Sequence, residues 1–216
     1  NYGLGLIAEG VKEIGLKYNV PVLDIYVASN AYSDRIRNEK SGSNISTIIT
    51  GTDSTHPDGP GGYLLGYLFA RAQETNDTVA AVTVDALTDT FYTDNAEISD
   101  LHITSQSVSY TYMPKAIPLY AGSDGYKYVK NLGVDITNTM NREIIKISNV
   151  EDGIYSLKMD GAVVGEYSAD ELAGGVNIAE LAKNPGQAQS KTAFELAAEL
   201  RLLEYYYRDR KCKDKF

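Results

Sequence analysis

The run of residues 20–27 reads VPVLDIYV and is apolar at nearly every position. A strand that is buried on both faces of a parallel sheet has this pattern, because its apolar residues do not alternate with polar ones. We therefore expect residues 20–27 to form such a strand. A strand of this kind next to helices predicts the α/β class.

Helical patterns lie on both sides of this run. Apolar residues recur at spacings of three and four from Leu4 to Tyr18 and again from Tyr63 to Ala72, which predicts two helices. One buried strand between two helices leaves both of its backbone edges unpaired. We expect residues 1–75 to be the last piece of a larger α/β sheet, whose earlier strands lie in an N-terminal segment outside this sequence.

The composition is that of an ordinary globular protein with one large or two small domains. The chain has 216 residues, of which 43% are hydrophobic and 23% charged. The net charge of -9 argues against nucleic acid as a partner, because phosphate binding needs a positive surface. No apolar run reaches the roughly 18 residues of a membrane span. Cys212 is the single cysteine and cannot close an internal disulfide.

A loop marked by glycine and proline, GTDSTHPDGPGGY at residues 51–63, holds the candidate catalytic residues. Asp53 lies three residues before His56, which is one of two histidines in the chain. A histidine that acts as a general base needs an acceptor for its second ring nitrogen, and an aspartate on a tight loop can fold back to provide it. Ser54 is a poor nucleophile, because a loop that turns Asp53 onto His56 directs the intervening side chain elsewhere.

From residue 76 onward the sequence is rich in β-branched residues and tyrosine. Strands are predicted near residues 79–84, 98–103, 107–112 and 143–147. Asp160-Gly161 predicts a tight hairpin turn between residues 154–159 and 162–167. Ser168 and Glu171 form a capping-box pattern at the start of a short helix, and a final helix is predicted from residue 188 to 208. We expect residues 76–216 to form a second, β-rich domain.

Two sets of motifs resemble the SGNH hydrolases, also called GDSL esterases or lipases. Asp53-x-x-His56-Pro57, followed by a helix, is similar to the final catalytic block of that family. The segments beyond it resemble, in order, the C-terminal extension of a bacterial subgroup: PKAIPL (114–119), MNREIIKI (140–147), GIYSLKMDG (153–161), ELAGGVNIA (171–179) and NPGQAQ (184–189). Together the two sets cover nearly the whole chain.

The resemblance implies a fold and a reaction. Residues 1–75 would be the C-terminal part of a flavodoxin-like three-layer α/β/α sandwich, and residues 76–216 a β-rich extension with a terminal helix. The implied activity is the hydrolysis of acyl esters, including acetyl esters on carbohydrate, without a metal or organic cofactor. His56 would take the proton of a serine hydroxyl and pass it to the leaving alcohol, and Asp53 would fix the tautomer of His56.

The nucleophilic serine and the oxyanion-hole residues of the family belong to upstream segments. The resemblance therefore implies that the missing N-terminal segment of the same protein is the main partner of this chain. Without it, the chain is expected to be almost inert as an esterase, because loss of the nucleophile from a triad costs on the order of a million-fold in turnover. The family and the acidic, cysteine-poor composition also favour a secreted or cell-envelope protein.

Other interpretations of the same residues remain open. Asp53 and His56 could simply tie their loop together. The 17 tyrosines could line a sugar-binding surface or serve as ordinary strand residues. The alternative function is a non-catalytic module, in which the β-rich region recognises glycan or another partner.

Overall fold

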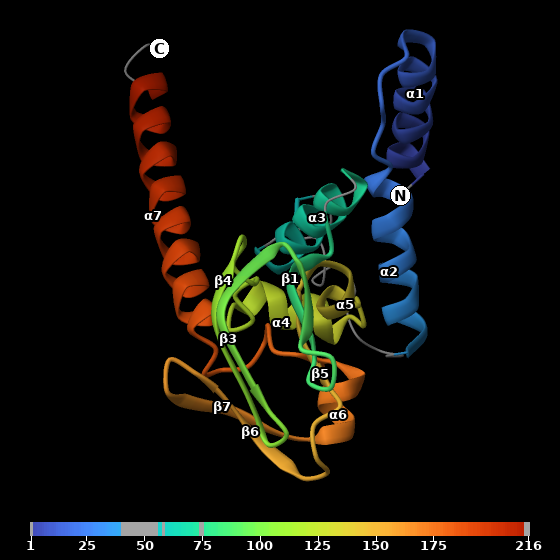
Figure 1. The fold of residues 1–216 in the computed structure, drawn as a ribbon. Helices are drawn as coiled ribbons and strands as arrows, with labels where there is room; N and C mark the ends of the chain where they lie inside the picture. Colours follow the sequence, from blue (N-terminus) through green and yellow to red (C-terminus); the bar gives the residue numbers. More distant parts are fainter. Residues whose placement is uncertain (1, 40–55, 58, 74–75, 214–216) are drawn as a thin grey trace. The chain divides into compact units, whose positions relative to one another are not determined.

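The computed structural model describes residues 2–39, 56–57, 59–73 and 76–213 and shows a mixed α/β fold (Figure 1). The chain divides into two compact units. Unit 1 comprises Asn1–Thr75 and Ser123–Ile136, and unit 2 comprises Asn76–Gly122 and Thr137–Phe216. In the described residues, unit 1 is built from helices and unit 2 carries the β-sheets. The assignment of residues 1–75 and 76–216 to two functional domains stays a prediction.

Unit 1 contains the helices α1 (Tyr2–Tyr18), α2 (Ile25–Glu39), α3 (Gly59–Ala72) and α4 (Asp124–Asn131). Helix α4 begins at the N-cap Ser123, whose hydroxyl accepts a hydrogen bond from the backbone N–H of Tyr126. Helices α3 and α4 pack through Tyr63, whose ring meets the ring of Tyr126 edge to face at a centroid distance of 6.4 Å. The helices predicted on either side of residues 20–27 are confirmed as α1 and α3.

The strand predicted at residues 20–27 is wrong. Residues 20–24 have no regular secondary structure, and α2 begins at Ile25. The Asp24 carboxylate accepts a hydrogen bond from the backbone N–H of Val27 at 2.9 Å, as a helix N-cap residue does. Lys12 of α1 forms an ion pair with the same carboxylate. Local capping therefore directs the second half of the run into a helix.

The main sheet of unit 2 has the strand order β2-β1-β5-β8. Strand β1 pairs in parallel with β5, whereas the β1–β2 and β5–β8 pairs are antiparallel. Alternate residues of β1 and β5 are buried, as expected for strands with one face on a core. The strand bounds are β1 (Thr78–Asp85), β2 (Thr90–Asp94), β5 (Arg142–Ser148) and β8 (Val176–Asn177).

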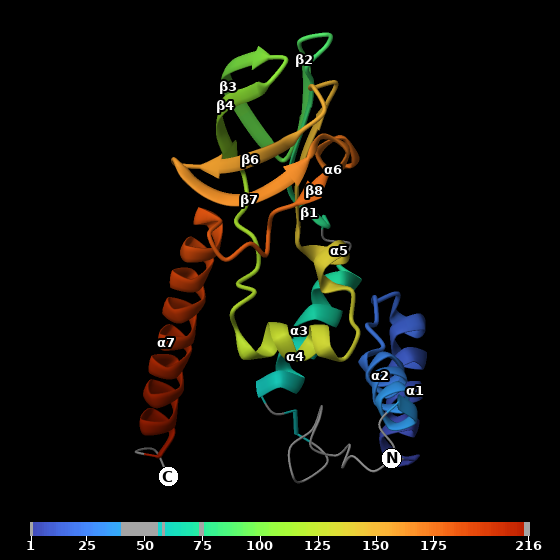
Figure 2. The same cartoon turned by 90° about the horizontal axis from the view of Figure 1, so that it is seen from below.

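Two antiparallel hairpins complete the β structure, as Figure 2 shows beside the main sheet. They are β3 (Ala96–Thr104) with β4 (Ser107–Pro114), and β6 (Ile154–Met159) with β7 (Ala162–Ser168). Asp160 and Gly161 both adopt positive φ, at 49° and 79°, which is the conformation that a two-residue type I′ turn requires. The predicted hairpin is confirmed.

Three helices belong wholly or mostly to unit 2: α5 (Ile136–Met140), α6 (Ala169–Gly174) and α7 (Pro185–Lys213). The predicted capping box is confirmed, because Glu171 N donates to Ser168 Oγ at 3.2 Å and Ser168 N donates to Glu171 Oε2 at 2.8 Å. The terminal helix is also confirmed and begins three residues earlier than predicted. The expected β-rich region with a final helix is therefore present.

Candidate functional site

The predicted catalytic pair is only partly described by the structure. His56 lies in a bend just before α3, and its side chain is exposed. Asp53 and Ser54 lie outside the described residues, so the pairing of Asp53 with His56 stays a prediction. The exposure of His56 is compatible with a general base, since a base must reach its substrate.

Helix α3, which follows His56, is held firmly by α4. Leu64 of α3 is fully buried. A side chain on Gly125 of α4 would place its Cβ 2.5 Å from the Tyr63 ring, so the two helices approach closely only because this residue is glycine. Burial raises the pKa of Tyr63, and a hydrogen bond with Ser123 partly offsets this effect. The segment that follows His56 is therefore the well-packed helix α3.

His102, the second histidine, lies on β3 in unit 2 and is exposed. Its ladder partner is Ser109 of β4. His56 lies in unit 1, so His102 has no predicted role in its chemistry. It provides a natural control for experiments on His56.

A buried carboxylate in unit 2 is the centre of a polar network that the sequence analysis missed. Both oxygens of Glu143 accept hydrogen bonds, one from Tyr112 Oη at 3.0 Å and the other from Asn184 Nδ2 at 2.7 Å. Burial raises the pKa of Glu143, although these two donors oppose the shift. Burial and the neighbouring carboxylate raise the pKa of Tyr112.

The network continues into the start of α7. Asn141 Oδ1 accepts from Leu119 N at 2.8 Å, and Gln187 Nε2 donates to Leu119 O at 2.9 Å. Ser190 Oγ donates to Pro118 O at 2.5 Å. The motifs MNREIIKI, PKAIPL and NPGQAQ therefore meet in space, where their polar side chains bond to the backbone of another motif or, for Glu143 and Asn184, to each other. Their first role is to tie α7 to the sheet.

A groove of about 970 Å³ lies in unit 2 next to this network. Its walls are β4 and β6, and its floor includes Glu143, Ile145 and Ile147 of β5. The only signal for it in the sequence is Glu143, which occupies an inward-facing position of a strand that otherwise turns isoleucine inward. A charged residue at such a position marks a polar network or a site.

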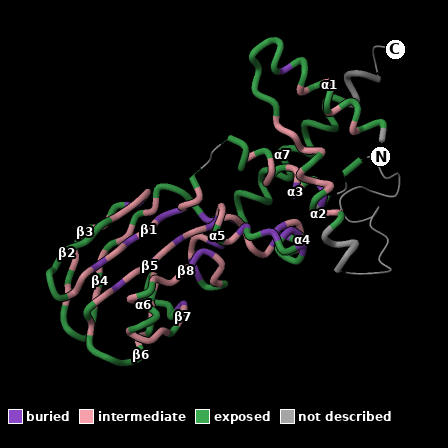
Figure 3. The backbone as a smooth tube through the Cα atoms, turned by 90° about the vertical axis from the view of Figure 1, so that its right-hand side faces the viewer, coloured by how far each residue is buried: buried purple, intermediate pink, exposed green. Residues whose placement is uncertain are grey.

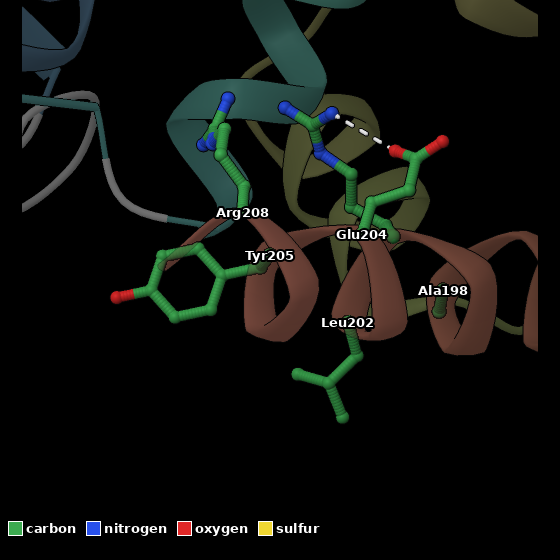
Figure 4. A pocket seen from close by; sticks show the side chains of 6 residues that line it. Ala198, Leu202, Glu204, Tyr205 and Arg208 are labelled. Atoms are coloured by element: carbon green, nitrogen blue, oxygen red, sulfur yellow. Dashed lines mark hydrogen bonds and ion pairs between the residues drawn. The ribbon is translucent and has the colours of Figure 1, made fainter. Parts of the chain in front are cut away.

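A second hollow, of about 490 Å³, lies on the surface of α7 (Figure 4). All of its lining residues belong to this one helix. Arg201 and Glu204 form an ion pair across it at 3.4 Å, and Leu202 and Tyr205 project from the helix. A single helix face of this kind does not define a binding site.

Two further properties concern the described residues alone. No group of three histidine, cysteine, aspartate or glutamate side chains is placed there so that it could hold a metal ion. No helix in the same ranges is long and apolar enough to cross a membrane.

Comparison with known proteins gives one informative likeness. The fold is similar to that of a gut microbial diltiazem-metabolizing enzyme, with 25% sequence identity and a TM-score of 0.78 over 91% of this chain. The matched region spans 45% of the length of that enzyme. No protein-family model matches the chain, and no curated protein matches its sequence. The α/β class is thus shared with a solved enzyme structure.

Proposed function

We propose that this chain is part of a serine ester hydrolase of the SGNH type. The observation that carries the proposal is the likeness to a drug-metabolizing enzyme over 91% of the chain. The Asp53-x-x-His56-Pro57 motif in front of α3 supplies the chemical side of the proposal.

In the proposed reaction, His56 removes the proton of a serine hydroxyl as the serine oxygen attacks the ester carbonyl. The imidazolium then donates that proton to the leaving alcohol, and a water molecule later releases the acyl group by the reverse sequence. Asp53 accepts from the other ring nitrogen of His56 and stabilises its charged form. The serine and the oxyanion hole come from another segment of the same protein.

The surface of unit 1 supports a missing neighbour of this kind. Large apolar side chains on one face of α1 are exposed, among them Ile7, Val11 and Ile14. A helix that bears apolar residues at helical spacing normally buries them against a sheet or another helix. We infer that an additional part of the hydrolase domain covers this face.

The proposed substrates are acyl esters, including acetyl esters on carbohydrate. We also propose that the protein works outside the cytoplasm or in the cell envelope. The family resemblance supports both statements.

The experiment is to produce the chain together with the upstream segment encoded by its gene and to measure the hydrolysis of an aryl acetate. His56→Ala should lower turnover by about 10⁴- to 10⁶-fold, because the members of a triad act as a unit. His102→Ala is the matched control and should leave the rate unchanged. Full activity in the His56→Ala protein, or no turnover in the parent, would contradict the proposal. The second result would favour the non-catalytic module.

A further inference from the structure

The groove of unit 2 lies between two strand edges. It is lined by every residue of β4 from Ser107 to Tyr112 and by every residue of β6. No residue of β3 or β7 lines it. Since β4 is paired with β3 and β6 with β7, the groove lies on the opposite side of each strand from its ladder partner.

The hydrogen-bond register shows where the backbone groups of β6 point. Ala169 N donates to Gly153 O at 3.0 Å, which makes Gly153 and Ala169 a hydrogen-bonded pair of the antiparallel ladder. The bonded residues then alternate, so Ile154 and Ser156 direct their N–H and C=O groups away from β7. These groups face the groove.

The same reasoning applies to β4. Lys115 N donates to Asn95 O at 2.9 Å, so the next bonded pair along the ladder is Glu97 with Met113. Tyr112, which lies opposite Ile98, directs its backbone groups away from β3. In the described residues, neither strand has a ladder partner on its groove side.

Strands β4 and β6 both begin at the same end of the groove. Glu151 N, just before β6, donates to Ser105 O at 2.9 Å, just before β4. The link is reinforced by Gln106 Nε2, which donates to Glu151 Oε2 at 2.9 Å. A third strand between two strands that start together can run antiparallel to both, which is the better hydrogen-bonded arrangement.

The lining suits an extended peptide. Alternate side chains of both strands turn toward the core cluster, including Val108 and Tyr110 of β4 and Leu157 and Met159 of β6. Every second residue of an inserted strand would meet this apolar surface. Glu151 and Asp152 lie at the start of β6, so this end of the groove rim is acidic. At the other end Asp160 is accompanied by Lys158, and their charges balance.

We propose that the groove between β4 and β6 binds an extended peptide segment of a partner protein by strand addition, with apolar residues at alternate positions and a basic residue at the end that meets Glu151 and Asp152. Main-chain hydrogen bonds to the strand edges supply affinity, and the apolar lining and the acidic end supply selectivity. The proposal is independent of the hydrolase chemistry assigned to His56.

A carbohydrate ligand is the less favourable occupant. Sugar binding by tyrosine uses the ring face together with the hydroxyl. The hydroxyl of Tyr112 donates to Glu143, and the hydroxyl of Tyr155 donates to Glu151 O at 2.6 Å. Two of the groove's tyrosine hydroxyls are thus engaged within the protein, whereas the backbone edges are available.

The probe is an acetylated peptide of about nine residues with alternating valine and threonine and a lysine at each end, long enough to span either strand. Binding to the chain of residues 1–216 is measured by calorimetry. A second peptide carries N-methyl groups at alternate residues, which removes the hydrogen bonds that the peptide donates to one edge. We expect it to bind at least about tenfold more weakly. A third peptide with glutamate at both ends should also bind more weakly.

A protein variant tests whether the groove edge of β6 binds the peptide backbone. Ser156→Pro removes an N–H on the groove edge of β6 and leaves the ladder to β7 intact, so we expect about tenfold weaker binding. Ser156→Thr, which keeps the N–H, is the matched control and should bind as the parent does.

The N-methylated peptide gives an answer with the parent protein even if Ser156→Pro does not fold. Equal affinity for the methylated and unmethylated peptides would overturn the proposal. So would the absence of peptide binding, with or without binding of a soluble oligosaccharide.

Discussion

The two units differ sharply in how they bury their apolar residues, as the colours of Figure 3 show along β1 and β5 on the one hand and α1 on the other. In unit 2, Val82 and Val84 of β1 are fully buried in one cluster with Ile145 and Ile147 of β5. In unit 1, Leu64 of α3 is fully buried, whereas Ile7 of α1 is 63% exposed. The apolar pattern is strong in both units, but in unit 1 the apolar face of α1 stays exposed in the described residues.

The contrast shows that a hydrophobic pattern predicts which face of a helix or strand is to be buried. It does not show whether the covering surface belongs to the same chain. Burial stabilises by about 25 cal/mol for each Å² of apolar surface removed from water. Unit 2 gains this free energy by burying apolar surface between its sheet, its hairpins and α6. Unit 1 gains it where α3 packs against α4, whereas the apolar face of α1 stays exposed and gains none.

The largest expected difference between the units comes from truncating one isoleucine in each. Ile145→Ala removes a buried side chain of unit 2 and should lower its free energy of unfolding by about 2–5 kcal/mol. Ile14→Ala removes an exposed side chain of α1 and should change stability by less than about 0.5 kcal/mol. Urea titration with peptide-resolved hydrogen exchange measures the units separately. A large loss from Ile14→Ala would mean that the chain itself covers α1, and the comparison would fail.

The next effect concerns the polar interior of unit 2. Asn184→Ala removes the donor to Glu143 Oε2 and to Ile178 O, and also the acceptor for Gly186 N. The loss should be about 2–3 kcal/mol, because a buried carboxylate loses one of its two donors. Thr192→Ala on the exposed part of α7 is the control, with an expected change within about 0.5 kcal/mol. Equal values for the two variants would show that the network does not stabilise unit 2.

A smaller effect should identify the tight contact of unit 1. Gly125→Ala forces a Cβ against the Tyr63 ring and should destabilise α3 and α4 by about 1–2 kcal/mol. Gly66→Ala in α3 meets no atom within 4 Å and should stabilise the same unit by up to about 1 kcal/mol, because alanine favours helix. Hydrogen exchange of α3 reports both changes. If Gly125→Ala also stabilises, the two helices are not closely packed.

The smallest expected effect is a change in the free energy of unfolding with pH. Glu143 has a raised pKa in the folded protein, so its contribution to stability is fully present below the ordinary value of 4.5 and is lost as the pH rises through the folded value. Glu143→Gln removes this titration. The stability of the parent relative to the variant should therefore fall as the pH increases over that window. Parallel urea midpoints for both proteins across the window would show that the carboxyl is not perturbed.

Local signals in the sequence were sufficient for much of unit 2. The Asp160-Gly161 turn and the Ser168–Glu171 capping box each depend on residues a few positions apart, and the structure has both. The groove was not predictable in this way. It depends on which edges of β4 and β6 stay unpaired, and on contacts such as that between Glu143 and Asn184, which are 41 residues apart.

The error at residues 20–27 has a different cause. The apolar run fits a buried strand, yet a strand needs neighbours, and the described residues of unit 1 provide none. With no partner edge, the capping side chain of Asp24 decides the conformation of the residues after it. Asp53 lies outside the described residues, so its pairing with His56 stays a prediction.

The route of the chain between β4 and β5 bears on how the protein can be dissected. Ser123–Ile136 sits in unit 1, although the residues on both sides of it belong to unit 2. Removal of residues 1–75 would therefore take α3 away from α4 and leave the Tyr126 ring without its contact with Tyr63. Producing unit 2 without unit 1 requires a short linker in place of residues 123–136. Fragments made by simple truncation would keep α4 with its apolar side chains exposed. Their aggregation would then report on α4 and not on the stability of the β-sheets.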